Sequence, residues 1–98
     1  MSLTPSQKRY LRGLAHALNP VIMTGNKGVT DAVTREFAQA LAHHELVKVK
    51  LGSDNRTDCA AQIAALAAAT GAEIVQTIGR VACFYRRNAK QPRLALPK

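Results

Sequence analysis

Aromatic residues are scarce in this sequence, which has no tryptophan, two tyrosines and two phenylalanines among its 98 residues. Domains that read single-stranded nucleic acid on a sheet use a set of aromatic side chains that stack on the bases, and no such motif is present. Phe37 falls on the apolar stripe of a predicted helix and Phe84 in a predicted strand, so both are expected in the core. Tyr85 could stack on a base, but we expect a packed ring with a hydrogen-bonded hydroxyl group.

Cysteines and long apolar runs are also limited. Cys59 and Cys83 are the two cysteines, and neither has a second cysteine or a histidine at metal-ligand spacing. We therefore expect buried, reduced thiols, no metal and no other cofactor. No apolar run approaches the roughly 20 residues of a membrane-spanning helix, and residues 1–13 lack the apolar stretch of a signal peptide. These absences favour a cytoplasmic protein with no membrane partner.

Acidic residues are the third shortage, and they leave the chain strongly basic. Asp and Glu number 6 against 14 Lys and Arg, which gives a formal net charge of +8. Residues 74–98 contain no acid at all. Positive charge concentrated at one end favours an anionic partner, nucleic acid before an anionic membrane, over a role in solubility alone. The length suits one domain, which we place at residues 1–88, followed by a basic tail at residues 89–98.

Three segments show the spacing and end signals of helices. Residues 4–7, Thr-Pro-Ser-Gln, form a capping box with proline at the first helical position, and this helix is expected to stop at Pro20. Apolar residues at helical spacing resume at Val29, which predicts a second helix directly after a turn. A third helix is predicted from the N-cap candidates at residues 53–55 to Gly71, a suitable left-handed C-cap.

Four short segments have the composition of strands, at residues 21–24, 46–51, 73–78 and 81–85. Residues 46–51 alternate lysine with apolar side chains, so one side of that strand is expected to face solvent. The last two segments should pair as an antiparallel hairpin. The order α-β-α-β-α-β-β predicts an α/β fold, a mixed four-stranded sheet packed with three helices. The pattern does not settle how the helices divide between the faces.

Residues 25–28, Gly-Asn-Lys-Gly, form the motif with the clearest binding chemistry. Gly25 and Gly28 allow backbone N–H groups to approach an anion closely, and a following helix would add its own N–H groups and dipole. Lys27 at a helix N-terminus is unfavourable unless an anion is present. We interpret this 25–28 loop as a phosphate clamp, and a plain tight turn explains it equally well. The loop lacks the spacing of a Walker motif and the third glycine of a dinucleotide fingerprint.

Basic residues outside the loop fall into three groups. Arg80 lies in the hairpin turn, and Arg86 and Arg87 leave the last strand. Arginine suits phosphate because its planar fork can bond two oxygens at once, while the alternative interpretation is a solvated strand end. The other two groups are Lys8, Arg9 and Arg12 on the first helix, and Lys48 and Lys50 on the solvent side of a strand. For both groups, the alternative interpretation is an ordinary solvent-exposed surface.

His43, His44 and Glu45 suggest an enzyme at first sight. Adjacent histidines point to different sides of a helix and are poorly placed to share a metal. His44 fits the apolar stripe, His43 is expected to be exposed, and both suit the C-terminal end of a helix dipole. No arrangement of catalytic groups stands above chance. We therefore expect a protein that is not an enzyme.

Three segments of the sequence resemble the YhbY-type CRM domain, the chloroplast RNA splicing and ribosome maturation module. They are LRGLAHALNPVIMTGNKGVTDAV, QALAHHELVKVKL and TGAEIVQTIGRVACFYRRN. The middle segment is unusually specific, and the last is similar to the strand–Ile-Gly–strand–Tyr-Arg ending of the family. The likeness covers residues 4–87, although residues 82–84 occupy a segment that is usually more aliphatic.

The resemblance implies a domain similar to the C-terminal domain of a bacterial translation initiation factor, with RNA bound through the Gly-x-x-Gly loop and nearby basic residues. Bacterial single-domain members associate with precursors of the large ribosomal subunit. We therefore expect a monomeric, non-enzymatic factor that binds rRNA of that precursor and assists ribosome assembly. The expected RNA contacts are Gly25, Asn26, Lys27, Gly28, Arg12, Arg80, Arg86 and Arg87. Two alternatives stay open, a small RNA-processing enzyme using His43 or His44 and a general RNA chaperone without ribosomal preference.

Overall fold

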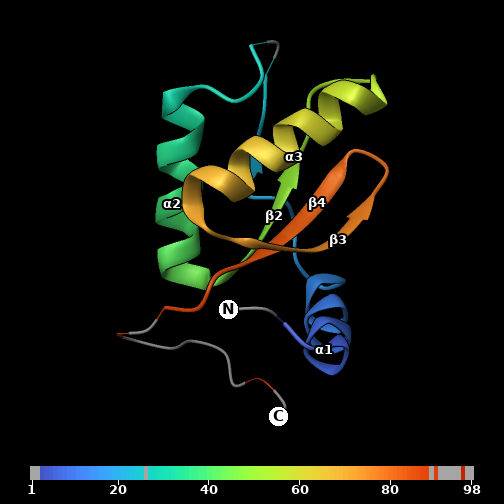
Figure 1. The fold of residues 1–98 in the computed structure, drawn as a ribbon, viewed down its shortest axis with the longest axis vertical. Coiled ribbons are helices and arrows are strands. Elements are labelled where there is room, and N and C mark those ends of the chain that lie inside the picture. Colours follow the sequence, from blue (N-terminus) through green and yellow to red (C-terminus); the bar gives the residue numbers. More distant parts are fainter. Residues whose placement is uncertain (1–2, 26, 89, 91–95, 97–98) are drawn as a thin grey trace.

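Helices and strands follow one another in the order that the sequence predicts (Figure 1). The structure is a computed structural model, and it describes residues 3–25, 27–88, 90 and 96. Its elements are α1 (Pro5–Ala15), β1 (Ile22–Met23), α2 (Asp31–His44), β2 (Leu46–Lys50), α3 (Arg56–Thr70), β3 (Glu73–Ile78) and β4 (Val81–Tyr85). The predicted tail at residues 89–98 lies outside the described residues except for Lys90 and Leu96.

The four strands form one mixed sheet, as predicted, in the order β1-β2-β4-β3. β1 runs parallel to β2, and β4 is antiparallel to both of its neighbours, β2 and β3. The β3–β4 hairpin turns through Gly79, whose φ of 57° is a conformation that favours glycine. A β-bulge between Ile74 and Gln76 interrupts the register of β3. Because β2 and β4 are the central strands, their alternating side chains pack on both faces of the sheet.

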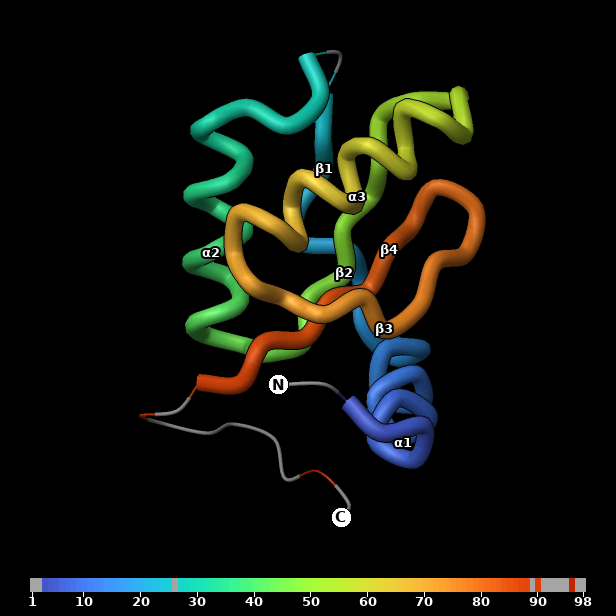
Figure 2. The backbone as a smooth tube through the Cα atoms, in the orientation of Figure 1, coloured from blue at the N-terminus to red at the C-terminus, as the bar shows by residue number. Residues whose placement is uncertain are grey.

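The helices divide unequally between the two faces of the sheet. α2 and α3 lie on one face and α1 lies on the other, against the lower end of the sheet in Figures 1 and 2. On the two-helix side, Phe37 of α2 meets Phe84 of β4 edge to face, with ring centroids 4.9 Å apart. On the other side, Leu11 of α1 packs in a cluster with Leu46 and Tyr85. Part of the second face is therefore left without a covering helix.

Local signals account for the ends of the helices. At α1, the Gln7 N–H donates to Thr4 Oγ1 and the Thr4 N–H donates to Gln7 Oε1, which confirms the predicted capping box. At α3, the side chain of Asn55 accepts from two N–H groups of the first turn. The same helix ends at Gly71 with a φ of 72°, which confirms the predicted left-handed C-cap.

Two helix boundaries differ from the sequence-based prediction. α1 ends at Ala15 rather than close to Pro20, because the N–H groups of Ala17 and Leu18 bond to carbonyl groups only three residues back and tighten the chain into a last, 3₁₀-like turn. α2 begins at Asp31 rather than directly at the end of the 25–28 loop. Both predicted helices are therefore longer than the helices in the structure, because apolar residues at helical spacing continue beyond the helical hydrogen bonds.

Both cysteines are buried free thiols, as predicted. Burial raises the pKa of the Cys83 thiol above its ordinary value, and the positive charge of Lys48, its neighbour across the strands, opposes this effect. Within the described residues, no helix has the length and apolar character needed to cross a membrane.

Candidate functional site

The structure separates the predicted contact residues into two groups. Three of the four loop residues, Gly25, Lys27 and Gly28, lie with Arg80 at the end of the sheet where β1 and β2 finish and β4 starts. The second group, which comprises Arg12 on α1 and Arg86 and Arg87 after β4, lies toward the other end of the sheet (Figure 1). Asn26 lies outside the described residues. The five residues of β4 separate the groups by about 16 Å along the strand.

The 25–28 loop is a tight turn that projects beyond the sheet at the top of Figure 2. The Gly28 N–H donates to the Gly25 carbonyl oxygen over 3.0 Å and closes the turn. Gly28 has a φ of 70°, a conformation that side chains strongly disfavour. Gly25 has no such restraint, and a methyl group added there would touch nothing within 4 Å. Gly28 therefore shapes the turn, whereas the space at Gly25 is open to a partner, beside the exposed Lys27.

A buried threonine that no sequence motif marks as functional holds this loop in place. Thr24 is 3% exposed; its Oγ1 donates to Gln62 Oε1 of α3 and accepts from the Gly52 N–H, each over 2.8 Å. Gly52 has no room for a side chain, since its Cβ would overlap the Thr24 carbonyl oxygen. These contacts join residues far apart in the sequence, and the sequence carries no local signal for them.

The start of α2 provides its own cap. Thr30 is the N-cap residue, and its Oγ1 accepts the Val33 N–H over 3.2 Å, while Asp31 places a carboxylate in the first turn. The prediction of a helix starting directly at the loop was wrong, because Val29 and Thr30 separate Gly28 from the first helical residue. An anion at the loop would therefore contact Lys27 and the N–H groups of the loop before it reached the N-terminus of α2. Thr30 already bonds one N–H group of that terminus, and the carboxylate of Asp31 offsets part of the positive end of the helix dipole.

Arg80 joins the hairpin turn to the segment after β2. Its side chain forms an ion pair with Asp54 over 2.6 Å, and the side chains are 54% and 90% exposed. Its carbonyl oxygen accepts the Leu51 N–H over 2.6 Å. An exposed pair of this kind contributes little to stability. The guanidinium group of Arg80 therefore stays accessible, but a carboxylate offsets its charge.

Arg86 has a role within the fold. Its guanidinium group donates to the carbonyl oxygens of Thr70, at the end of α3, and Ala38, in α2. The neighbouring Arg87 is exposed. Arg86 was predicted to contact RNA, and in the structure its planar fork bonds two backbone carbonyl groups instead of facing solvent freely.

Glu45 is, like Thr24, a buried polar residue, and it lies near the end of β4. It is fully buried, and its φ of 62° makes it the residue at which the chain turns from α2 into β2. Its Oε2 accepts the Asn88 N–H over 2.6 Å, and its carbonyl oxygen accepts the Arg86 N–H over 2.9 Å. Glu45, which follows the two histidines considered above for enzymatic chemistry, anchors the chain after β4.

The two adjacent histidines lie at the exposed end of α2, with ring centroids 6.2 Å apart. His44 follows the buried Leu41 at helical spacing, as predicted, and lines a cavity with Leu14, but it is exposed and does not enter the core. Among the described residues, no group of three or more His, Cys, Asp or Glu side chains is placed to hold a metal ion. Tyr85 is 3% exposed, so its ring is not available to stack on a base.

The face of the sheet that α1 covers in part carries lysines and apolar side chains in two rows. We call these rows the open face. Strand register places Met23, Lys50, Val81 and Ile78 side by side in one row, and Lys48, Cys83 and Gln76 in the next. Neither row contains a carboxylate. Lys50, Met23 and Ile78 are exposed. The first row lies at the same end of the sheet as the 25–28 loop, because Met23 is followed directly by Thr24 and Gly25.

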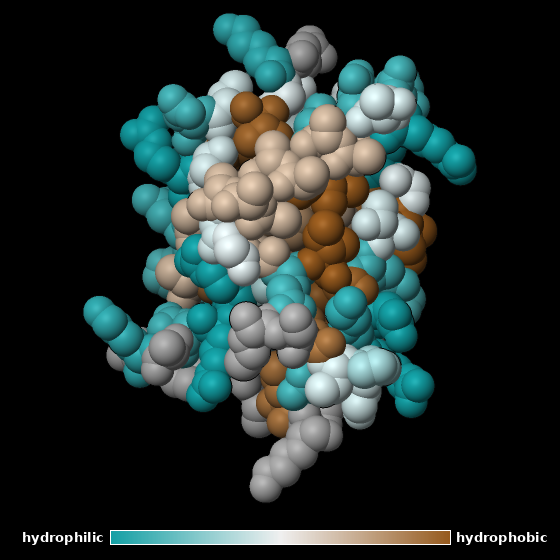
Figure 3. Space-filling view, viewed as in Figure 1, coloured by the Kyte–Doolittle hydropathy of each residue, from teal (hydrophilic) through white to brown (hydrophobic). Residues whose placement is uncertain are grey.

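The opposite side of the molecule has a different character. Figure 3 shows α3 covering it with small and apolar residues, and six exposed alanines lie along this helix: Ala60, Ala61, Ala64, Ala65, Ala68 and Ala69. Two of the six acidic residues, Asp31 and Asp58, lie in the first turns of α2 and α3. The open face therefore suits an anionic partner better than the face that these helices cover.

Known proteins resemble this chain over nearly its whole length. The sequence matches the family model of the CRS1/YhbY (CRM) domain over residues 3–86. A protein of Haemophilus influenzae named as an RNA-binding protein is 42% identical over 97 residues, covering 99% of this chain and 97% of that protein. The probable RNA-binding protein YqeI of Bacillus subtilis is 35% identical over 95 residues, covering 97% and 99% of the two chains.

One solved structure supports the fold directly. The solution structure of a hypothetical protein from Staphylococcus aureus matches with a TM-score of 0.83 and 34% sequence identity, covering 98% of this chain and 100% of that one. This match confirms the predicted α/β arrangement of three helices and a mixed four-stranded sheet.

Proposed function

The chain belongs to the CRS1/YhbY (CRM) domain family, and from this premise we propose that it binds RNA along a surface that runs from the 25–28 loop over the open face to α1. Relatives that share its full length are named as RNA-binding proteins. The formal net charge of +8 supports a polyanionic ligand. The observation that carries the proposal is the loop, in which Gly25 and Lys27 are exposed and which Thr24 holds in place.

The loop is built to approach a phosphate backbone closely. Gly25 leaves space that no other part of the described chain enters, and Lys27 is exposed beside it. Because Thr24 is bonded to both Gln62 and Gly52, the loop is positioned before an RNA arrives. A preordered loop loses little conformational freedom on binding, which favours affinity.

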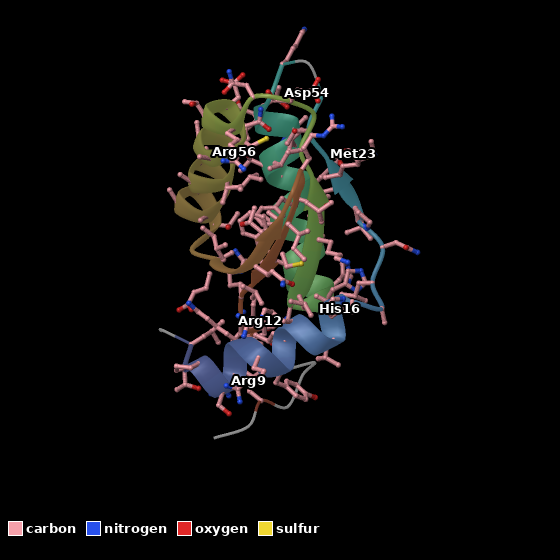
Figure 4. All side chains as sticks on the ribbon, turned by 90° about the vertical axis from the view of Figure 1, so that its right-hand side faces the viewer. Arg9, Arg12, His16, Met23, Asp54 and Arg56 are labelled. Carbon is pink, nitrogen blue, oxygen red and sulfur yellow. The ribbon has the colours of Figure 1, made fainter. Side chains whose placement is uncertain are left out.

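Basic side chains extend this surface away from the loop. Lys50 and Lys48 lie in successive rows of the open face, and Arg12 lies on α1 below them (Figure 4). Arg80 adds a fifth cation at the edge of the first row, since it directly precedes Val81. If about five phosphates are neutralised, log K should fall with log salt concentration at a slope of roughly −3.5 to −4.5.

We further propose that the RNA is rRNA of the large ribosomal subunit precursor and that the protein assists assembly without catalysing a reaction. The resemblance to bacterial single-domain CRM proteins supports this finer statement. The exposed positions of His43 and His44, on the side of the molecule away from the loop, support a non-enzymatic role.

The experiment that tests the proposal measures affinity for precursor rRNA at several salt concentrations, with a homopolymer RNA as competitor. We expect tight binding, a slope in the stated range and weak competition. A salt-insensitive affinity would contradict the proposed surface, and equal competition by the homopolymer would favour a general RNA chaperone. Labelled RNA that is cleaved by the pure protein, and not by the His43→Ala/His44→Ala variant, would favour an enzyme.

A further inference from the structure

A hollow lies on the open face where α1 stops covering the sheet. The cluster beneath α1 includes Leu46 and Tyr85, which form the last covered row. The next row, Lys48, Cys83 and Gln76, is covered in part, and the row beyond it is open. The step between helix and sheet leaves a cavity of about 200 Å³. Its size is below the range of sites for drug-sized molecules, so it suits a single ring system.

The lining of the hollow combines an apolar floor with a polar rim. Val81 and Cys83 of the central strand β4 form its floor, and Ala15 and Ile78 complete the apolar lining. We call the polar lining residues the rim; they are His16, Lys48 and Gln76. His16 caps the end of α1, so the step itself places its ring at the edge of the cavity. Figure 4 shows His16 at the end of α1 that adjoins the strands, with Met23 farther along β1. The lining residues include no carboxylate.

This combination fits a nucleobase better than other small groups. A base presents an apolar ring to a floor of aliphatic side chains and needs hydrogen bonds at its edge. The amide group of Gln76 can both donate and accept there. The exposed ring of His16 can stack against a base. Lys48 uses one of its N–H groups to bond the Leu18 carbonyl oxygen over 3.1 Å and has further donors for a phosphate.

Phosphate contacts are available on both sides of the hollow. Lys50 lies in the first row of the open face, toward the 25–28 loop. Arg12 lies one helical turn before His16 and therefore on the same side of α1. An RNA strand that runs from the loop to α1 passes directly over the cavity. The negative charge of its backbone suits the cations along this path, whereas a protein interface would require a larger apolar patch with fewer lysines.

We propose that the hollow binds one unstacked nucleobase of the RNA, held by His16 and Gln76 over the floor formed by Val81 and Cys83. The inference rests on the proposed function and deepens it, since it adds base contacts to a surface otherwise expected to read phosphates and shape. A single base site is also compatible with the scarcity of aromatic residues, because one base in a pocket needs no series of aromatic side chains to stack on.

The test compares two rim substitutions with matched controls on α2. The probe is a short single-stranded RNA of mixed sequence containing 4-thiouridine, and affinity is measured over a series of salt concentrations. We expect the His16→Ala/Gln76→Ala variant to bind about tenfold more weakly with an unchanged salt slope, because base contacts neutralise no phosphate. Both control positions are exposed on α2, away from the open face, and the His43→Ala/Gln39→Ala variant should bind like the native protein.

The outcomes separate this proposal from the function on which it rests. Photo-crosslinks from 4-thiouridine to residues 76–83, reduced in the rim variant, would support the base site. Native RNA affinity in the rim variant would overturn the base site while leaving RNA binding intact, and the open face would then suit a protein partner. Failure of the native protein to bind either this probe or precursor rRNA would overturn the proposed function and the base site together.

Discussion

Arg86 donates a hydrogen bond from its Nη1 to the carbonyl oxygen of Thr70, the last residue of α3, over 2.9 Å. Its Nη2 donates to the carbonyl oxygen of Ala38 in α2 over 3.3 Å. A single side chain at the end of β4 therefore joins the two helices that cover one face of the sheet. This arrangement assigns Arg86 a structural role, although its residue type and position also suit a phosphate contact.

Replacing Arg86 by alanine should destabilise the domain. Hydrogen bonds to a charged group are typically worth about 1.5–3 kcal/mol when one partner is removed, and the half-buried position of Arg86 favours the lower end of that range. Urea denaturation followed by circular dichroism measures the change in the free energy of unfolding. Arg87→Ala is the control, because Arg87 is the exposed neighbour and its loss should change stability by at most about 0.5 kcal/mol. Equal effects of the two substitutions would contradict the structural role.

The two loop glycines should respond differently to alanine. Gly28→Ala places a side chain in the left-handed conformation, at a φ of 70°, and should lower the free energy of unfolding by about 1–2 kcal/mol. Gly25→Ala meets no neighbouring atom and should leave stability unchanged. It should nevertheless weaken RNA binding, because the added methyl group occupies the space left for the backbone of the partner. Native RNA affinity in a stable Gly25→Ala variant would argue against close approach at this position.

Thr24 should be important for the position of the loop. Thr24→Val keeps the shape of the side chain but leaves the Gly52 N–H and the Gln62 side chain without their observed partner, at a cost of about 1–3 kcal/mol. Thr77→Val on β3 is the control, since Thr77 is exposed. Faster amide hydrogen exchange at residues 25–28 in Thr24→Val would show the loosened loop directly. If exchange there stays at the native rate, Thr24 does not hold the loop.

Alkaline pH should destabilise the domain through Cys83 and Tyr85. Burial raises the pKa of the Cys83 thiol, and burial together with the negative charge of Glu45 raises the pKa of the Tyr85 hydroxyl, against the opposing charge of Arg87. The folded state therefore holds both protons more tightly than the unfolded chain. This contribution is complete below the ordinary values of 9.0 and 10.0 and is lost as pH rises through the folded pKa values.

Urea denaturation at a series of pH values measures this loss. We expect the free energy of unfolding to fall from about pH 9 upward, and to fall less steeply in the Cys83→Ala/Tyr85→Phe variant. The comparison concerns the slopes, because the substitutions themselves change the core packing. Identical slopes in the two proteins would exclude these two groups as the cause.

The elements of the fold could be predicted because their signals are local. The capping box at Thr4 and the left-handed cap at Gly71 each depend on a few neighbouring residues. The alternation of Lys48 and Lys50 with apolar residues likewise predicted a strand with one solvent side. The division of the helices between the faces depends on which strands pair, and no local pattern records that.

The site was harder to predict for the same reason. The glycine loop was recognised from its own four residues, but Thr24 bonds Gln62 at a separation of 38 positions. The fork of Arg86 reaches Ala38 at a separation of 48. A basic residue next to a strand looks the same in sequence whether it faces solvent or carbonyl groups. The residue type of Arg86 and its match to the Tyr-Arg ending of the family placed it in the site, whereas no local signal placed Thr24 there.

The measurement that tests the central claim most directly compares three single variants that each lose one positive charge. Lys27→Ala removes an exposed cation from the loop, Lys50→Ala removes one from the open face, and Arg35→Ala removes one from α2. Affinity for precursor rRNA over a series of salt concentrations should fall in the first two variants, with a salt slope weaker by about one in each, and change little in Arg35→Ala. Equal losses in the three variants, or a larger loss in Arg35→Ala, would contradict binding at the 25–28 loop and the open face.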